Sequence, residues 1–212
     1  MPQSQSDVML DTAAQLITED GFDAVSLSRI ATEVGVDDDD VLTEFGSLED
    51  LLVAMLNREF SRMWAVIVDN IDRDPRGGFL SQIYRYTLTA VYERPLARAL
   101  YLMDRDGLNT IMRATHGFAY IPEFGVRAGF IERMQDVGMV RRDVNPEELS
   151  ALLSAVCAGA ALTAPNSELD KVSEGLLMLL ERGADTDVTD TSPGKAAYVE
   201  FAMSLVNRKD LA

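Results

Sequence analysis

Four consecutive aspartates, Asp37–Asp40, are the residues of this sequence whose type and spacing indicate the clearest chemistry. Glu44 follows one helical turn later. Carboxylates placed in this way repel anions such as phosphate and attract basic groups. Residues 1–57 hold thirteen acidic residues and one basic residue, Arg29, and so carry a net charge of −12. The other 155 residues hold 22 acidic and 18 basic residues, so most of the chain's charge of −16 lies in its first quarter.

Two further residues with reactive side chains, His116 and Cys157, are each the only one of their kind in the sequence. A metal site needs several ligands, and nucleophilic catalysis needs a base beside the nucleophile. The sequence has no metal-ligand spacing, no P-loop and no G-x-S-x-G motif. Cys157, in the apolar segment "LLSAVCAGAAL", is expected to pack as a small apolar residue, and a lone histidine is more often structural than catalytic. The sequence therefore predicts no catalytic residue, metal site or cofactor, and it disfavours an enzyme.

The composition is that of an ordinary globular protein, with 47% hydrophobic and 25% charged residues among 212. No segment reaches the roughly 18 consecutive apolar residues that a membrane span requires. The segment "MPQSQSDVML" lacks the basic region and the apolar run of a signal peptide. We therefore expect a cytoplasmic protein that does not enter a membrane.

Two helices are expected to precede the aspartates and to position them. Residues 7–20 carry apolar side chains at helical spacing and end at Gly21. Ser26 can cap a second helix over residues 27–34, and Gly35 then permits a turn with positive φ. The aspartates therefore open a third helical segment, directly after a turn.

This third segment is short and leads into a long helix. Its inward candidates are Val41, Leu42 and Phe45. Ser47 and Asp50 form a capping box, after which an apolar stripe continues for several turns, so this helix is expected to join two layers of the protein.

The rest of the sequence also predicts helices and offers no convincing strand. Expected helices lie near residues 79–93, 95–103, 106–115, 123–137, 146–162, 168–182 and 196–209. The segment "DRDPRGG" breaks the chain at residues 72–78, and the polar run 183–195 is expected to be a loop or a mobile linker. The fold class is therefore all-α.

The N-terminal pattern resembles the N-terminal domain of the TetR family of bacterial transcriptional regulators. The similarity covers roughly residues 7–56 without gaps. It includes Ala13–Ala14, Gly21–Phe22, Ile30–Ala31, Gly35–Val36, Phe45 and the "S.EDLL" that starts the long helix. Weaker similarities lie in "MQDVGMVRRDVNPEELSALLSAVCAGA" and "LLMLLERG", which resemble the approach to the family's eighth helix and the end of its ninth.

The resemblance implies a helical homodimer with two domains. A helix-turn-helix domain of three helices would cover residues 1–46, and a larger ligand-binding and dimerisation domain would cover residues 47–212. A ridge of small residues at four-residue steps supports close approach of a second helix, and these residues are the candidate dimer contacts: Ala151, Ala155, Gly159 and Thr163. Ordinary packing within one chain is the alternative explanation of this ridge.

The sequence departs from the family at the positions that would face DNA. There the family carries small polar or basic residues, then a Tyr, a His and a Lys. The corresponding positions here are Asp37, Asp38, Asp39, Asp40, Leu42, Glu44 and Leu48. The basic residues that commonly precede the first helix are also missing from "PQSQSD".

Helix capping explains only part of this departure. An aspartate is a good N-cap, and acidic residues in a first turn are favoured by about 0.3–1 kcal/mol each. Capping does not require four of them, because like charges three or four residues apart repel. It also does not explain Glu44, near the helix end, where the helix dipole disfavours an acid. The sequence therefore predicts weak or absent binding of duplex DNA.

Two functional hypotheses follow from these patterns. In the first, the chain is a ligand sensor whose acidic helix acts through a protein partner, such as a basic DNA-binding surface. In the second, it is a conventional DNA-binding repressor that contacts its operator in an unusual way. Aromatic and methionine side chains after residue 60 would suit a small hydrophobic or aromatic ligand, and the candidate ligand contacts are Trp64, Tyr101 and Phe118.

Overall fold

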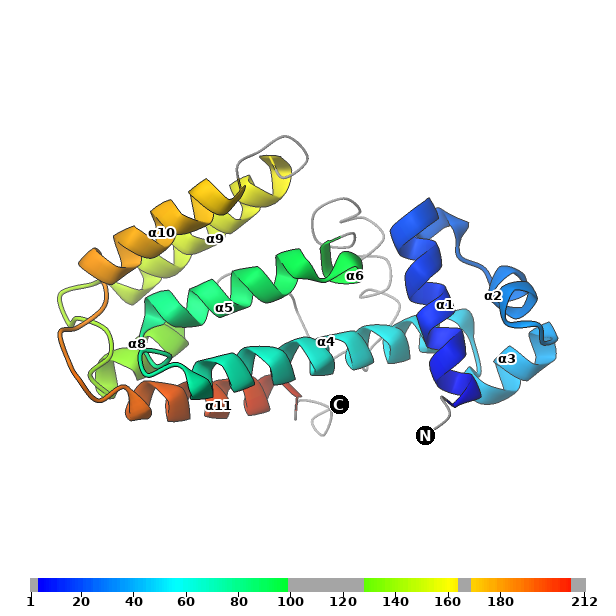
Figure 1. The fold of residues 1–212 in the computed structure, drawn as a ribbon, viewed down its shortest axis with the longest axis horizontal. Coiled ribbons are helices and arrows are strands. Elements are labelled where there is room, and N and C mark those ends of the chain that lie inside the picture. The colour runs from blue at the N-terminus through cyan, green and yellow to red at the C-terminus, as the bar shows by residue number, and fades with distance from the viewer. Residues whose placement is uncertain (1–3, 99–127, 164–168, 207–212) are drawn as a thin grey trace. The chain divides into compact units, whose positions relative to one another are not determined.

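The computed structural model describes residues 4–98, 128–163 and 169–206. Within these ranges the regular secondary structure is helical, apart from a single bridge between Val140 and Asp185, which confirms the all-α prediction. The elements are α1 (Gln5–Asp20), η1 (Phe22–Ala24), α2 (Leu27–Val34), α3 (Asp38–Phe45), α4 (Leu48–Arg73), α5 (Leu80–Glu93), α6 (Pro95–Arg98), α8 (Ala128–Asp136), α9 (Pro146–Thr163), α10 (Leu169–Gly183) and α11 (Ser192–Val206) (Figure 1). None of these helices combines the length and apolarity that crossing a membrane would take.

The described residues form two compact units. The N-terminal unit contains residues 4–62 and 92–98, and the C-terminal unit contains residues 63–91, 128–163 and 169–206. Helix α4 contributes residues to both units. This division falls within α4, between residues 62 and 63. The domain boundary expected between residues 46 and 47 remains a prediction.

In the N-terminal unit, the helix ends form as their sequences predict. Ser26 Oγ accepts the backbone N–H of Arg29 at 3.2 Å and caps α2, and Ser47 Oγ accepts the N–H of Asp50 at 3.1 Å before α4. Gly35 ends α2 with a left-handed φ of +78°. This conformation is unfavourable for a residue with a Cβ, so glycine fits the turn between α2 and α3.

The core of the N-terminal unit lies where α1, α2, α3 and the first turns of α4 meet. Its buried side chains include Met9, Ala13, Ile17, Ile30, Ala31, Val41 and Leu51. Val41 is the inward residue of α3, whereas Leu42, also expected to face inward, is 38% exposed. The reason is rotation around a short helix: Val41 takes the face toward α1 and α2, and its neighbour in sequence points about 100° away from it.

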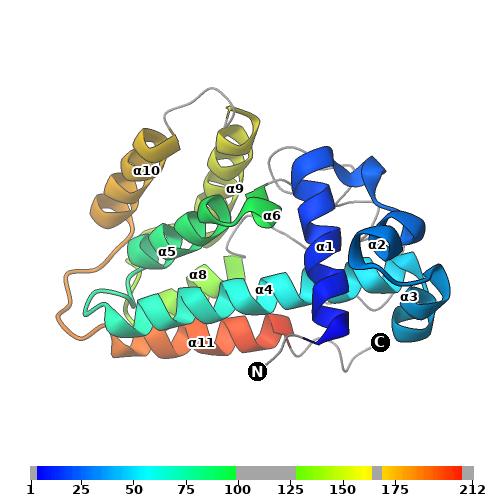
Figure 2. The ribbon, with the colours of Figure 1, turned by 45° about the vertical axis from the view of Figure 1, so that its right-hand side comes forward.

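In the C-terminal unit, aromatic side chains join three helices. Trp64 of α4 lies 5.9 Å from Tyr198 of α11 between ring centroids, and Phe130 of α8 lies 4.7 Å from Phe201 of α11. Figure 2 shows α11 running along the second half of α4. Such aromatic contacts stabilise a core beyond the area that they bury, so α11 is a component of the core of this unit.

The segment from Gly183 to Lys195 forms the expected loop only between the end of α10 at Gly183 and the start of α11 at Ser192. Ala184, Asp185 and Thr191 are buried, and α11 already begins at Ser192. Arg141 N–H donates to the Ala184 carbonyl at 2.8 Å, and Thr186 N–H donates to that of Met139 at 3.2 Å. The segment is therefore a fixed connection, held by backbone bonds to the turn after α8.

A close approach of backbones fixes the turn between α4 and α5. A Cβ on Gly78 would lie 1.9 Å from the Thr191 carbonyl oxygen, and a Cβ on Gly194 would lie 2.0 Å from that of Gly78. Thr191 Oγ1 also donates to the Pro75 carbonyl at 2.7 Å. Glycine is needed at both positions because two segments 116 residues apart meet backbone to backbone.

Candidate functional site

The candidate site is the surface of the helix-turn-helix formed by α2, the turn at Gly35 and α3. Asp37 is the N-cap of α3, and its backbone N–H donates to Asp40 Oδ2 at 3.2 Å. The Asp40 N–H in turn donates to the Asp37 carbonyl at 3.0 Å. These two aspartates therefore close the first turn of the helix.

Asp38 and Asp39 have no comparable structural role. Both are exposed in the first turn of α3, and the capping bonds involve only Asp37 and Asp40. A carboxylate near a helix N-terminus is mildly favoured by the helix dipole. Their main consequence is thus the charge that they place on the surface.

The negative charge of this surface is not balanced by nearby basic side chains. Within the described residues, no Lys or Arg forms an ion pair with any of Asp37–Asp40 or with Glu44. Arg29, the only basic residue before Arg58, forms an ion pair with Asp20 instead. The surface of α3 therefore presents its negative charge directly to solvent.

The other acidic residues near the start of the chain are, by contrast, partly neutralised. Arg58 of α4 forms ion pairs with Asp7, at 3.0 Å, and with Asp11. A hydrogen bond from Ser4 Oγ and the bond from Arg58 both lower the pKa of Asp7. Sequence reasoning missed this role of Arg58, because its partners lie 51 and 47 residues away.

The remaining positions that would face DNA are also not basic. Leu42 and Glu44 are exposed on α3, and Leu48 is half-buried at the start of α4. Glu44 accepts a hydrogen bond from Ser6 Oγ, which ties the start of α1 to the end of α3. That these seven positions bear on DNA binding remains a prediction, and their exposure agrees with it for all except Leu48.

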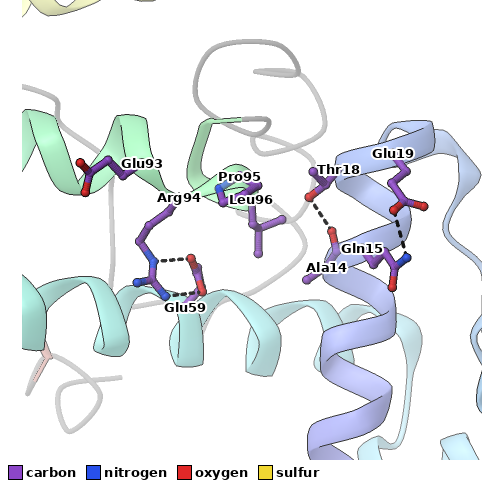
Figure 3. Close-up of a pocket in the computed structure, with 9 residues that line it drawn as sticks. All are labelled: Ala14, Gln15, Thr18, Glu19, Glu59, Glu93, Arg94, Pro95 and Leu96. Carbon is purple, nitrogen blue, oxygen red and sulfur yellow. Dashed lines mark hydrogen bonds and ion pairs between the residues drawn. The ribbon is translucent and has the colours of Figure 1, made fainter.

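A crevice of about 490 Å³ lies elsewhere in the N-terminal unit, between α1, α4 and the start of α6. Arg94 donates to both carboxylate oxygens of Glu59, at 2.6 and 3.1 Å, and this pair forms one wall (Figure 3). The bond to Glu59 raises the pKa of the guanidinium. Gln15 and Thr18 line the opposite side from α1. Gln15 donates to Glu19 at 3.0 Å and Thr18 donates to the Ala14 carbonyl at 2.8 Å, so these polar groups, like Arg94 and Glu59, already have partners within the unit.

The three candidate ligand contacts are placed only in part. Trp64 lies on α4 against Tyr198, whereas Tyr101 and Phe118 fall outside the described residues. Within the described part of the chain, no group of three or more His, Cys, Asp or Glu side chains is arranged to hold a metal ion. Trp64 as a ligand contact therefore remains a prediction.

The candidate dimer contacts lie on an exposed helix face. Ala151, Ala155 and Gly159 of α9 are exposed, and the side chain of Thr163 falls outside the described residues. The same helix exposes Leu152 at 55%, and the adjoining α10 exposes Leu179 at 63%. Each of these large apolar side chains is exposed on a helix that contacts the other, so both are further candidates for an interface.

A helix-turn-helix near the N-terminus followed by a larger helical unit defines a class of protein, the all-helical helix-turn-helix proteins. Within this class, the model of the family described as bacterial regulatory proteins, tetR family, matches residues 9–55. Residues 9–55 are thus similar to the helix-turn-helix of that family, and the described helices show the TetR-like fold.

Solved structures show the same fold. A regulator from Rhodococcus sp. assigned to the TetR family is 18% identical, with a TM-score of 0.56, and the match covers 84% of this chain and 96% of that one. The fatty acid degradation regulator FadR from Bacillus halodurans is 16% identical, with a TM-score of 0.60 and coverages of 86% and 97%. FadR from Bacillus subtilis, solved in complex with stearoyl-CoA, is 15% identical, with a TM-score of 0.59 and coverages of 83% and 97%. A comparison with curated proteins found no match.

Proposed function

We propose that this protein is a TetR-family regulator of the cytoplasm, ligand-responsive and homodimeric, that binds duplex DNA weakly or not at all. Its acidic α3 surface would act through a protein partner that carries a basic surface. The observation that carries the proposal is the set of exposed carboxylates of Asp37–Asp40 and Glu44, which no described basic side chain neutralises.

The magnitudes favour loss of DNA binding. Non-specific binding at physiological salt is worth roughly 5.5–8 kcal/mol, and it arises almost wholly from basic residues that release counterions. A carboxylate about 4 Å from a phosphate adds a repulsion of about 1 kcal/mol even in water. Arg29 cannot offset several repulsions of this kind, because it already forms an ion pair with Asp20.

The carboxylates that repel DNA phosphates would attract a basic protein surface. Carboxylates on one face of α3 can pair with Arg or Lys side chains of a partner, as phosphates do in DNA. Charge complementarity of this kind speeds association and makes it sensitive to salt. The partner we propose is therefore a protein with a basic patch, such as the DNA-binding surface of another regulator.

Capture of partners from the native cell extract tests this interaction. We expect the wild-type chain to retain at least one basic protein at low salt, and a variant with Asp38→Ser, Asp39→Ser and Glu44→Gln to lose it. This variant leaves the capping pair Asp37 and Asp40 intact. If no captured protein depends on these three carboxylates, or if the dependent protein is acidic, the proposed partner is wrong.

The ligand side of the proposal rests on the fold and on one relative. FadR from Bacillus subtilis was solved with stearoyl-CoA, a molecule with a long apolar chain. The aromatic and methionine side chains of this sequence suit a hydrophobic or aromatic molecule. We therefore propose such a ligand for the C-terminal unit, with Trp64, Tyr101 and Phe118 as candidate contacts.

The exposed face of α9 and α10 is the proposed dimer interface. Introducing a charge at Leu179, which is 63% exposed on α10, should disrupt it. We expect Leu179→Glu to raise the dimer dissociation constant about 100-fold, because a charge buried without a partner costs several kcal/mol. Analytical ultracentrifugation across a concentration series measures this change. The matched control is Met203→Glu on α11, where a similarly exposed side chain, at 58%, lies outside the proposed interface. Equal effects of both substitutions would argue against this interface.

A further inference from the structure

A buried carboxylate, Asp185, lies at a junction within the C-terminal unit. Its residue is 8% exposed, and its oxygens accept two hydrogen bonds from the fully buried Ser81 in the first turn of α5. One comes from the Ser81 backbone N–H, at 3.3 Å, and the other comes from the Ser81 hydroxyl. Asp185 thus caps α5 from 104 residues away.

The main chain holds Asp185 in this position from both sides. Its N–H donates to the Leu180 carbonyl at 3.0 Å, at the end of α10. The neighbouring residues Ala184 and Thr186 bond to Arg141 and Met139, which follow α8. These bonds fix the backbone of Asp185 at the end of α10 and beside the turn after α8, and so place its carboxylate next to Ser81.

We propose that Asp185 and Ser81 form a proton-sensitive lock on the C-terminal unit, which takes up a proton on mild acidification and stabilises the unit when protonated. The lock lies beside a cavity of about 660 Å³ between the turn after α4, the end of α10 and the segment that leads to α11.

Charged groups surround the lock, and the pKa of Arg76 is raised by its hydrogen bond to Glu181 and also by the charge of Asp185. The charged residues that line the same cavity are Glu181 and Arg182 of α10, Arg76 of the turn after α4, and Asp187 of the segment after Asp185. Arg76 forms its ion pair with Glu181, and Arg141, on the turn after α8, forms one with Asp143. Among the described residues, no basic side chain forms an ion pair with Asp185.

Burial raises the pKa of Asp185 from 3.8 to about 6. The hydrogen bonds from Ser81 oppose this change, and the charge of Glu181 adds to it. Between about pH 4 and pH 6, the folded protein thus binds a proton that the unfolded chain does not. The free energy of unfolding should therefore rise as the pH falls through 6, and this gain is lost as the pH rises again.

The effect is separable from those of other carboxyl groups. Asp7, Asp143, Glu181 and Asp190 have pKa values lowered by their hydrogen bonds, so the stability that they contribute is lost as the pH falls below about 5, the opposite direction to the effect of Asp185. For Asp185 alone, the folding equilibrium constant should increase about tenfold between pH 7 and pH 5.

Urea unfolding at pH 5, 6 and 7, with the full chain, tests the lock. The fluorescence of Trp64, the only tryptophan, reports on the C-terminal unit. Wild type should gain about tenfold in its folding equilibrium constant from pH 7 to pH 5 relative to Asp185→Asn, which keeps the shape and cannot titrate. His116 and the other acidic residues are common to both proteins, so their contributions cancel in this comparison.

A second variant and a second measurement keep the test decisive. Ser81→Ala removes the hydroxyl that stabilises the ionised carboxylate, so the pH midpoint of the effect should move upward. If Asp185→Asn does not fold, proton release on unfolding of the wild type at pH 5 to 6, compared with Ser81→Ala, gives the same information. Parallel pH profiles for wild type and Asp185→Asn, or a midpoint unmoved by Ser81→Ala, would overturn the proposal.

Discussion

Reversing three carboxylates, with Asp38→Lys, Asp39→Lys and Glu44→Lys, is expected to give this protein a measurable affinity for duplex DNA that the wild type lacks. The change removes three negative charges and adds three positive ones, so the net charge of residues 1–57 rises from −12 to −6. Each phosphate that a new lysine neutralises releases counterions, so the logarithm of the binding constant should fall with the logarithm of salt concentration by about 0.9 per contact. At low salt we expect affinity for a random duplex to rise at least about tenfold.

The helix should survive this reversal. The bonds that close the first turn of α3 come from Asp37 and Asp40, which the variant retains. Lysines in the first turn cost about 0.3–1 kcal/mol each against the helix dipole, whereas a lysine in place of Glu44 near the other end is favoured. Circular dichroism should therefore show an unchanged helix content.

Fluorescence anisotropy at low and at physiological salt measures the gain. The matched control carries Glu132→Lys, Asp136→Lys and Glu148→Lys, which adds the same charge at exposed positions of α8 and α9. This control should remain without affinity for DNA if the position of the charge matters as well as its sign. Sub-micromolar binding of duplex DNA by the wild type at physiological salt would contradict the prediction.

A single methyl group at Gly78 is expected to destabilise the C-terminal unit severely. The added carbon would lie 1.9 Å from the carbonyl oxygen of Thr191, far inside van der Waals contact. That oxygen cannot retreat easily, because it already accepts the N–H groups of Gly194, at 3.1 Å, and Lys195, at 3.2 Å. We expect Gly78→Ala to lower the free energy of unfolding by about 3 kcal/mol or more.

Thermal unfolding, followed by circular dichroism, checks this expectation. A loss of about 3 kcal/mol corresponds to a fall in Tm of roughly 6–12 °C for a chain of this size. Gly129→Ala, on the exposed side of α8, is the matched control, since its Cβ would meet no atom within 4 Å. The control should leave Tm unchanged or slightly raised; a similar, small change in both variants would show that the turn can adapt.

Local signals were sufficient to predict the helix-turn-helix. Ser26, Gly35 and Ser47 each act on neighbours within a few residues, and capping and turn chemistry operate over that range. The acidic surface could also be predicted, because the exposed side chains of a short helix can be assigned once its buried residue, here Val41, is known. Leu42 shows the limit of this approach, since a helix of eight residues has too few apolar positions to fix its rotation from sequence alone.

Contacts between distant segments could not be predicted in the same way. Asp185 lies in the polar run "GADTDVTDTSPGK", where every local signal indicates exposure, and only the approach of Ser81 from 104 residues away buries it. The pair of Arg94 with Glu59 spans 35 residues for the same reason. Such contacts depend on how helices pack, and helical spacing carries no information about their partners.

The four aspartates differ in their structural roles, and this difference affects how the surface can evolve. Asp37 and Asp40 are committed to closing a helix turn, so mutations there carry a folding penalty whatever the protein binds. Asp38 and Asp39 are free of that constraint, and one or two base changes per codon can turn an aspartate into a neutral or basic residue. A protein with this helix can therefore change the charge of its binding surface through a few substitutions, none of which prevents folding. Negative charge that persists at those two positions in related chains would then indicate selection for what the surface binds.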